Sequence, residues 1–247
     1  AIRLFGDRTD VQFGCHHWPM WGKERVISFL KKQRDLYKFI HDQTLRLANK
    51  GFSKEEIAEQ IKLPKSLAQE FYNRDYYGTV HHNSKAVFVR YLGYFDGNPS
   101  TLYERPPVER AIRYVEWMGG PAKILEKAKE SFDSGDYRWT AEVLNHVVMA
   151  DEKHEEARYL LADTLEQLGY QSESATWRNF FLCGALELRE GLPPTRDFVP
   201  SSGMAVGIPI DQVFKTMAVR LLPEQVDGEV IQAVSYTHLR AHETDYY

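Results

Sequence analysis

Residues 121–190 read PAKILEKAKESFDSGDYRWTAEVLNHVVMADEKHEEARYLLADTLEQLGYQSESATWRNFFLCGALELRE. Small residues recur 34 positions apart here, pairing Ala128 with Ala162, Gly135 with Gly169, and Ala141 with Ala175. That period is typical of tetratricopeptide (TPR) units, each of which is a pair of helices. The pattern predicts two helix pairs, with turns at residues 134–136 and 168–170. Because there are only two units, we expect TPR-like pairs within a larger helical domain, or two plain antiparallel pairs, rather than a solenoid.

Helical patterning extends to the N-terminal side of these repeats. From Glu24 onward, residues fall near the three-four spacing of one helix face, namely Val26, Phe29, Leu30, Tyr37, Ile40, Thr44 and Leu47. Gly51 ends this helix, and Ser53 with Glu56 forms a capping box that opens the next one. Further helices are predicted at residues 84–94 and 108–118. The sequence therefore predicts a mainly α protein.

The flanks of the helical region look different. Residues 11–15 alternate like a strand and lead into His16-His17-Trp18-Pro19, where we expect Pro19 and Gly22 to break the chain. On the other side, a linker is expected around Pro193. A last helix is predicted to start at Pro209, a residue type tolerated in the first turn, and to stop before Pro223.

Composition excludes several classes of protein. The chain has 247 residues and a formal net charge of -4, so nothing favours nucleic acid as a partner. Residues 51–74 resemble a helix-turn-helix, but the second helix, expected at 65–74, is not basic enough to read DNA. The sequence contains no run of eighteen apolar residues, so nothing in it predicts a membrane-spanning helix. The two cysteines, Cys15 and Cys183, form no disulfide framework.

Two stretches could carry chemistry. His16 or His17, just after a strand, is well placed to bind zinc through a neutral imidazole. Zinc needs three or four ligands, so packing of these rings against nearby tryptophans stays open. In residues 76–83, a helix N-terminus would suit a sulfate or phosphate, with His82 as proton donor and Asn83 as hydrogen-bond partner. The alternative is that Asn83 only caps the helix and the histidines are solvated.

These stretches together resemble the alkylsulfatases of the metallo-β-lactamase superfamily. His16-His17-Trp18-Pro19 is similar to the family's last metal-binding segment, and residues 33–44 to the first helix of its dimerisation domain. Residues 77–83 (YGTVHHN) and 90–99 (RYLGYFDGNP) resemble its most recognisable motifs. Residues from 201 onward (SSGM) look like the start of its sterol-carrier-like C-terminal domain.

The resemblance implies a hydrolase that cleaves alkyl sulfate esters such as dodecyl sulfate, with two zinc ions activating a water. It implies that His16 binds zinc, with His17 as second choice. His82 would be the catalytic residue of the sulfate pocket. The substrate-binding candidates are Asn83, Tyr77, Arg90 and Tyr91.

The resemblance also implies a domain plan. Residues 1–22 would be the remnant of a metallo-β-lactamase-like catalytic domain, and 23–192 the helical dimerisation domain of a homodimer. Residues 193–233 would start a sterol-carrier-like α+β domain. Residues 234–244 match one reading frame of a sequencing adapter, and residues 234–247 are interpreted as an artefact tail.

The family's His-x-His-x-Asp-His zinc motif is missing from the chain. We therefore expect the chain alone to be inactive, with its motif lying before Ala1, and we assign no compartment. The alternative to an alkylsulfatase is a non-catalytic TPR-like module that binds a protein partner.

Overall fold

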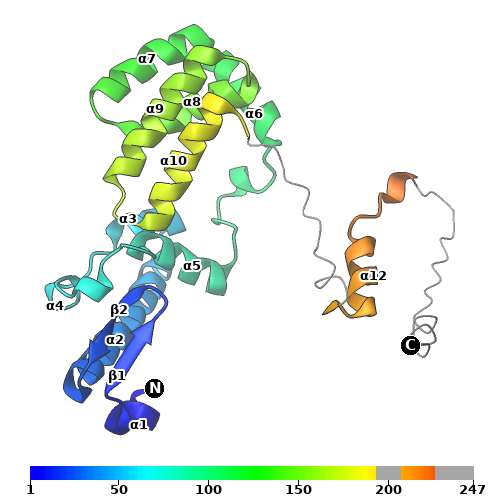
Figure 1. The fold of residues 1–247 in the computed structure, drawn as a ribbon. Coiled ribbons are helices and arrows are strands. Elements are labelled where there is room, and N and C mark those ends of the chain that lie inside the picture. Colours follow the sequence, from blue (N-terminus) through cyan, green and yellow to red (C-terminus); the bar gives the residue numbers. More distant parts are fainter. Residues whose placement is uncertain (193–206, 226–247) are drawn as a thin grey trace, which may run out of the picture. The chain divides into compact units, whose positions relative to one another are not determined.

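The computed structural model describes residues 1–192 and 207–225, which fall into two units that we describe separately (Figure 1). The second unit contributes helix α12 (Ile210–Ala218), with Pro209 as its N-cap, and a 3-10 turn, η4 (Pro223–Gln225). The predicted start of the sterol-carrier-like domain at 201 and the predicted tail at 234–247 lie outside the described residues.

The first unit begins with a short helix, α1 (Ile2–Phe5), a 3-10 turn, η1 (Gly6–Arg8), and an antiparallel hairpin, β1 (Val11–Gly14) and β2 (His17–Trp21). Val11 pairs with Trp21 and Gly14 with His17, with a bulge between Gln12 and Gly14. The prediction that Pro19 breaks the chain is wrong, since Pro19 lies inside β2. Both strands of a two-stranded sheet are edges, where a residue without an N–H is tolerated.

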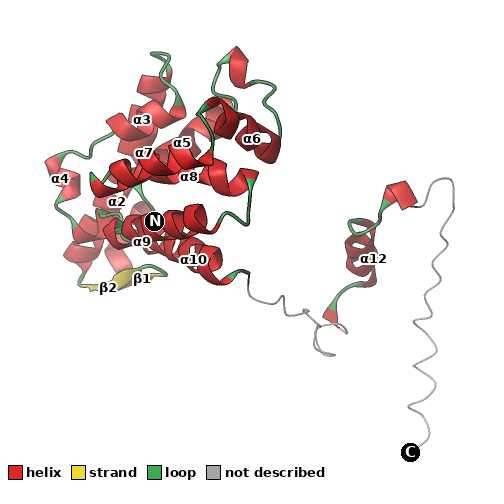
Figure 2. Cartoon of the chain, turned by 90° about the horizontal axis from the view of Figure 1, so that it is seen from above, coloured by secondary structure: helices red, strands yellow, loops and turns green. Residues whose placement is uncertain are grey.

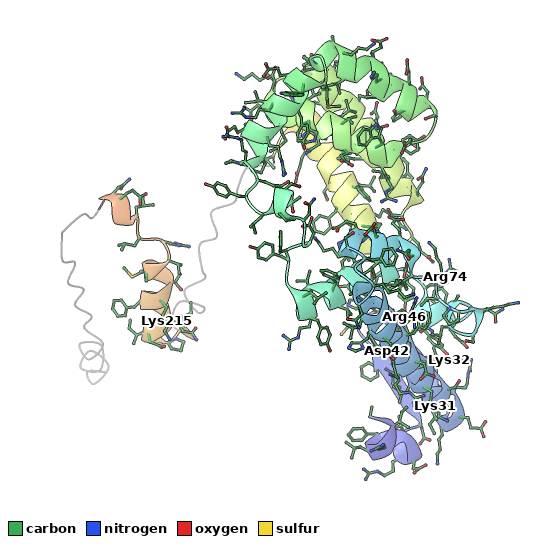
Figure 3. All side chains as sticks on the ribbon, turned by 180° about the vertical axis from the view of Figure 1, so that it is seen from behind. Lys31, Lys32, Asp42, Arg46, Arg74 and Lys215 are labelled. Atoms are coloured by element: carbon green, nitrogen blue, oxygen red, sulfur yellow. The ribbon has the colours of Figure 1, made fainter. Side chains whose placement is uncertain are left out.

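The long helix α2 (Lys23–Ala48) packs against the hairpin and several shorter helices. Its buried face consists of Val26, Phe29, Ile40, Thr44 and Leu47, as the spacing predicted, although Tyr37 is exposed. Charged side chains, including the labelled Lys31, Lys32, Asp42 and Arg46, lie along this helix (Figure 3). A helix with an apolar stripe and a charged remainder is expected at the border of a core.

Three short elements follow: α3 (Lys54–Gln60), α4 (Lys65–Ala68) and the 3-10 turn η2 (Phe71–Asn73). The predicted capping box is confirmed, because the Ser53 side chain accepts from the Glu56 N–H and the Glu56 carboxylate accepts from the Ser53 N–H. The prediction of a second helix at 65–74, from the helix-turn-helix pattern, is wrong. Helix α4 ends after one turn, so no DNA-recognition helix forms there.

Helix α5 (Val80–Leu92) starts four residues earlier than predicted. Its N-cap is Thr79, whose hydroxyl oxygen accepts from the His82 N–H at 2.9 Å. Asn83 therefore lies inside the first turn and does not cap the helix, because Thr79 supplies the hydroxyl that such a position favours. The 3-10 turn η3 (Pro99–Thr101) and helix α6 (Pro107–Trp117) complete this half.

Four helices then form the predicted pairs: α7 (Pro121–Asp133), α8 (Tyr137–Ala150), α9 (Glu155–Gln171) and α10 (Ala175–Glu190). The apolar core of these pairs consists of buried residues on α7, α8 and α9, namely Ile124, Leu125, Ala128, Val143, Leu144, Val147, Ala157 and Leu161. The chain is thus mainly helical, and among the described residues strands occur only in the hairpin (Figure 2).

One of the two predicted turns is wrong. Gly135 takes a φ of +83° between α7 and α8, as a turn glycine should. Gly169, its repeat partner, lies inside α9. A Cβ at Gly169 would come within 2.9 Å of Leu182 Cδ2 on α10. The small residue is therefore needed for close helix crossing, and the real turn lies at residues 172–174.

Candidate functional site

A cavity of about 360 Å³ brings several of the predicted site residues together. It lies between the hairpin, α2, the loop before α5 and the first turn of α5. His16, His17, Tyr77 and Asn83 all line it, although the hairpin and α5 are some sixty residues apart in the chain. His82, Arg90 and Tyr91 are not among its lining residues.

The two hairpin histidines are each held by a tyrosine of the same loop. The His16 ring stacks on Tyr77, with centroids 3.6 Å apart and planes 13° from parallel. His17 Nδ1 is hydrogen bonded to the Tyr76 hydroxyl, and its ring packs edge-on against Phe29, with centroids 5.3 Å apart. Adjacent loop residues therefore orient adjacent histidines.

His17 has the electrostatic character of a neutral imidazole. Burial, helped by the neighbouring His16, lowers the pKa of His17 below its usual value. If Nδ1 donates its proton to Tyr76, the Nε2 lone pair is left free. A ring fixed at one nitrogen by a hydrogen bond and free at the other is the usual arrangement of a metal-binding histidine.

The N-terminus of α5 already has a negative partner. The Asp75 carboxylate accepts from the Val80 N–H at 3.0 Å, and the Thr79 hydroxyl accepts from the His82 N–H. Burial, reinforced by Glu173, raises the pKa of Asp75, whereas the bond from Val80 opposes that rise. An anion at this helix start would compete with a carboxylate of the protein itself, a detail that the sequence pattern did not reveal.

The remaining predicted residues lie on other surfaces of α5. His82 is exposed, and its ring meets Trp177 of α10 edge-on, with centroids 5.3 Å apart. The Tyr91 hydroxyl is hydrogen bonded to His41 Nε2 at 2.9 Å. Arg90 is exposed. The structure thus separates these three residues from the cavity that contains His16 and Asn83.

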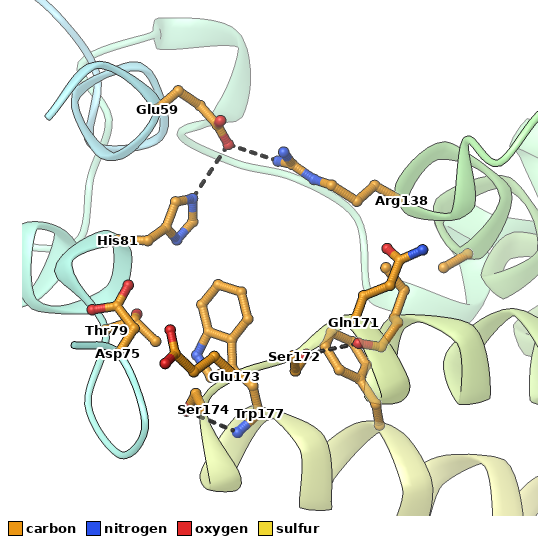
Figure 4. A pocket seen from close by; sticks show the side chains of 13 residues that line it. Glu59, Asp75, Thr79, His81, Arg138, Gln171, Ser172, Glu173, Ser174 and Trp177 are labelled. Carbon is orange, nitrogen blue, oxygen red and sulfur yellow. Dashed lines mark hydrogen bonds and ion pairs between the residues drawn. The ribbon is translucent and has the colours of Figure 1, made fainter. Parts of the chain in front are cut away.

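A second cavity, of about 610 Å³, lies between α5 and the ends of α8, α9 and α10 (Figure 4). On one side Glu59 accepts from Arg138 at 2.8 Å and contacts His81 Nε2 at 3.3 Å. Burial, more than any neighbouring charge, lowers the pKa of His81, and its Nδ1 is buried without a partner. Sequence reasoning missed this cluster because Glu59 and Arg138 lie 79 residues apart and belong to no motif.

The residues of the first cavity, which His16 and His17 line, fit zinc only in part. Imidazoles suit the ion, yet within residues 1–192 and 207–225 no group of three histidine, cysteine or acidic side chains gathers. This part of the chain therefore offers one or two ligands and no complete site. In the same residues, no helix is both long and apolar enough to cross a bilayer.

The family model of alkyl sulfatase dimerisation matches residues 53–191 of the chain. The matched region runs from the capping box of α3 to the end of α10. It includes Tyr77, His82 and Asn83 but not the hairpin.

Individual proteins match more of the chain. A linear primary-alkylsulfatase from Pseudomonas sp. is 50% identical over 97% of this chain and 36% of its own length. An alkyl/aryl-sulfatase from Saccharomyces cerevisiae is 49% identical over 92% of this chain and 35% of its own. The solved structure of a stereoselective inverting sec-alkylsulfatase from Pseudomonas sp. superposes with a TM-score of 0.86 at 44% identity, covering 91% of this chain and 36% of that one. The chain spans about a third of the length of these relatives.

Proposed function

The chain belongs to the alkyl sulfatase dimerisation family, and from that premise we propose that it is part of an alkylsulfatase that hydrolyses alkyl sulfate esters to an alcohol and sulfate. Its relatives of known name are alkylsulfatases of about three times its length. In this proposal the chain supplies the dimerisation region and one wall of the active site.

One observation carries the proposal. His16, Tyr77 and Asn83 come from two distant segments, each singled out for its own pattern, and they line one cavity. Their position on one cavity wall is what the alkylsulfatase proposal requires of these residues, and it supports that proposal. A non-catalytic TPR-like module remains the alternative, but no described feature favours it over the enzyme.

We propose zinc as the cofactor, two ions in the complete enzyme, with His16 as a ligand and His17 as second choice. When bound, zinc would lower the pKa of a water and supply a nucleophile at neutral pH. The stacked Tyr77 holds His16, and the Tyr76 hydroxyl holds His17. Because fewer than three candidate ligands gather here, the remaining ligands would have to come from outside the described residues.

The substrate roles are assigned to the start of α5. His82 is proposed as the proton or hydrogen-bond donor to the ester. Asn83 and Tyr77, which line the cavity, are proposed to bind the sulfate, with Arg90 and Tyr91 as more distant contributors. Arg90 would be the residue able to bind sulfate through two parallel hydrogen bonds.

The domain plan is part of the same proposal. Residues 1–22 would belong to a metallo-β-lactamase-like catalytic domain, 23–192 to the dimerisation domain and 193–233 to a sterol-carrier-like domain. The complete protein would be a homodimer.

The test is an assay of the complete protein that contains this chain. We expect zinc-dependent release of sulfate from dodecyl sulfate, abolished by a chelator and restored by zinc. His16→Ala and His17→Ala form a matched pair. If His16 is the ligand, His16→Ala should lose bound zinc and activity, whereas His17→Ala should keep its zinc stoichiometry.

Two results would contradict the proposal. Full activity in both histidine variants would remove the hairpin from the zinc site. An absence of sulfate release from a folded, zinc-loaded protein would favour the protein-binding module. Lys85→Ala, on α5 and outside the cavity that His16 and His17 line, is the control for nonspecific loss.

A further inference from the structure

The start of α10 is hydrogen bonded to residues 76–77, the loop that lies against the hairpin histidines. The Ala175 N–H donates to the Tyr76 carbonyl at 2.9 Å. The Ser174 hydroxyl donates to the Tyr77 carbonyl at 2.7 Å, and the Thr176 hydroxyl donates to the same oxygen at 3.0 Å. Three donors from one helical turn thus fix two consecutive carbonyls that lie almost a hundred residues away in sequence.

Ser174 is the most enclosed member of this group. It is 2% exposed, and its side-chain oxygen also accepts from the Trp177 N–H at 3.3 Å, which makes it the N-cap of α10. The nearby Arg74–Glu173 ion pair joins the same two segments but is half exposed. An exposed pair contributes little, so the buried hydroxyl dominates the attachment.

The side chains of the same loop hold the histidines. Tyr77 stacks on His16, and the Tyr76 hydroxyl is bonded to His17. The loop is therefore held through its backbone by α10 and holds the hairpin through its rings. A continuous series of contacts runs from Ser174 through Tyr77 to His16.

We infer that Ser174, assisted by Thr176, is a positioning residue for the hairpin histidines, acting through the backbone of residues 76–77. The functional meaning of this inference rests on the proposed function, in which one of these histidines binds zinc. Ligand groups must be held within about 0.5 Å and 10–20° of their working geometry, and supporting hydrogen bonds achieve this. A helix pair that looks like scaffold would then set the geometry of the site.

The test is NMR spectroscopy of the histidine rings in this chain, with zinc absent. A ring stacked on tyrosine resonates upfield, so His16, assigned by His16→Gln, reports the stack. We expect Ser174→Ala to move the His16 and His17 ring signals towards those of free imidazole. Ser174→Thr, which keeps the hydroxyl, should retain the wild-type signals.

A matched control separates positioning from capping. Ser53→Ala removes the N-cap of α3, whose capping hydrogen bonds join only Ser53 and Glu56, and should leave both ring signals in place. Thr176→Val removes a hydroxyl donor and its contact with the Ser174 hydroxyl but leaves the capping side chain of Ser174 in place. It should shift the His16 signal in the same direction by a smaller amount.

Unchanged ring signals in a folded Ser174→Ala chain would overturn the inference. If that variant does not fold, Thr176→Val decides, and an unmoved His16 signal there overturns it as well. Because no zinc or substrate enters the experiment, it can succeed even where the sulfatase proposal fails, and the two failures remain distinguishable.

Discussion

In the helix pairs α7–α10, eight buried residues on α7, α8 and α9 form a continuous apolar core, whereas among the hairpin residues 11–21 no side chain is buried. Phe13 and Trp18 of the hairpin are each 76% exposed. The pairs are held by apolar burial, which grows with the area removed from water. The hairpin is held by a few directed contacts, among them the bond from His17 to Tyr76. The stable region and the candidate site are therefore built by different kinds of interaction.

The largest effect should follow from emptying the helical core. Leu144 is fully buried in the cluster of α7–α9. We expect Leu144→Ala to lower the free energy of unfolding by about 2–5 kcal/mol, because the cavity relaxes only in part. Urea denaturation measures this. Phe13→Ala in the hairpin, the matched control, should change it by less than about 0.5 kcal/mol; an equal loss would end the contrast.

A smaller effect should come from the crossing of α9 and α10. In Gly169→Ala the new methyl group would meet Leu182 Cδ2 at 2.9 Å and Cγ at 3.0 Å. Overpacking lowers the free energy of unfolding by about 1–3 kcal/mol. The better helix propensity of alanine offsets about 1 kcal/mol of that loss.

Gly184→Ala on the facing helix is the control for that change. Its new methyl group would meet only the terminal Leu165 Cδ1, at 3.2 Å. A flexible terminal methyl can move aside, so this variant should be neutral or stabilised in thermal unfolding. Equal melting temperatures for the two variants would show that Gly169 is not required for packing.

Removing one hydroxyl should loosen the hairpin and leave the helix pairs unchanged. Tyr76→Phe deletes the partner of His17 Nδ1, a contact worth about 0.5–1.5 kcal/mol. We expect chymotrypsin to cut the exposed hairpin several-fold faster, with no change in global unfolding. Tyr77→Phe keeps the stack on His16 and should cut at the wild-type rate. Equal rates for both would mean that this bond does not hold the hairpin.

The smallest effect concerns acid. His146 packs against Tyr114 with centroids 4.7 Å apart, and burial, reinforced by Arg110, lowers its pKa below the usual 6.5. The unfolded chain binds this proton more readily, so stability should fall as the pH drops below 6.5. In His146→Gln, the loss of melting temperature between about pH 7 and 5 should be smaller. An unchanged pH dependence would show that His146 contributes nothing to it.

Local patterns predicted the helical elements well because their causes are local. The capping box at Ser53, the face of α2 and the turn at Gly135 each depend on residues within a few positions of one another. One error came where a distant partner intervened. Gly169 looked like a turn glycine because its repeat partner is one, but Leu182 gives it another role.

The sequence alone determined the period of the helix pairs, the mainly helical character and the residue types at the site, because these follow from spacing and side-chain chemistry. Only the tertiary structure decided that His16, Tyr77 and Asn83 share a cavity while His82 faces Trp177. It also decided that the Ser174 hydroxyl donates a hydrogen bond to the Tyr77 carbonyl. Contacts between residues up to a hundred positions apart depend on how packed helices bring surfaces together, and no local pattern encodes that arrangement.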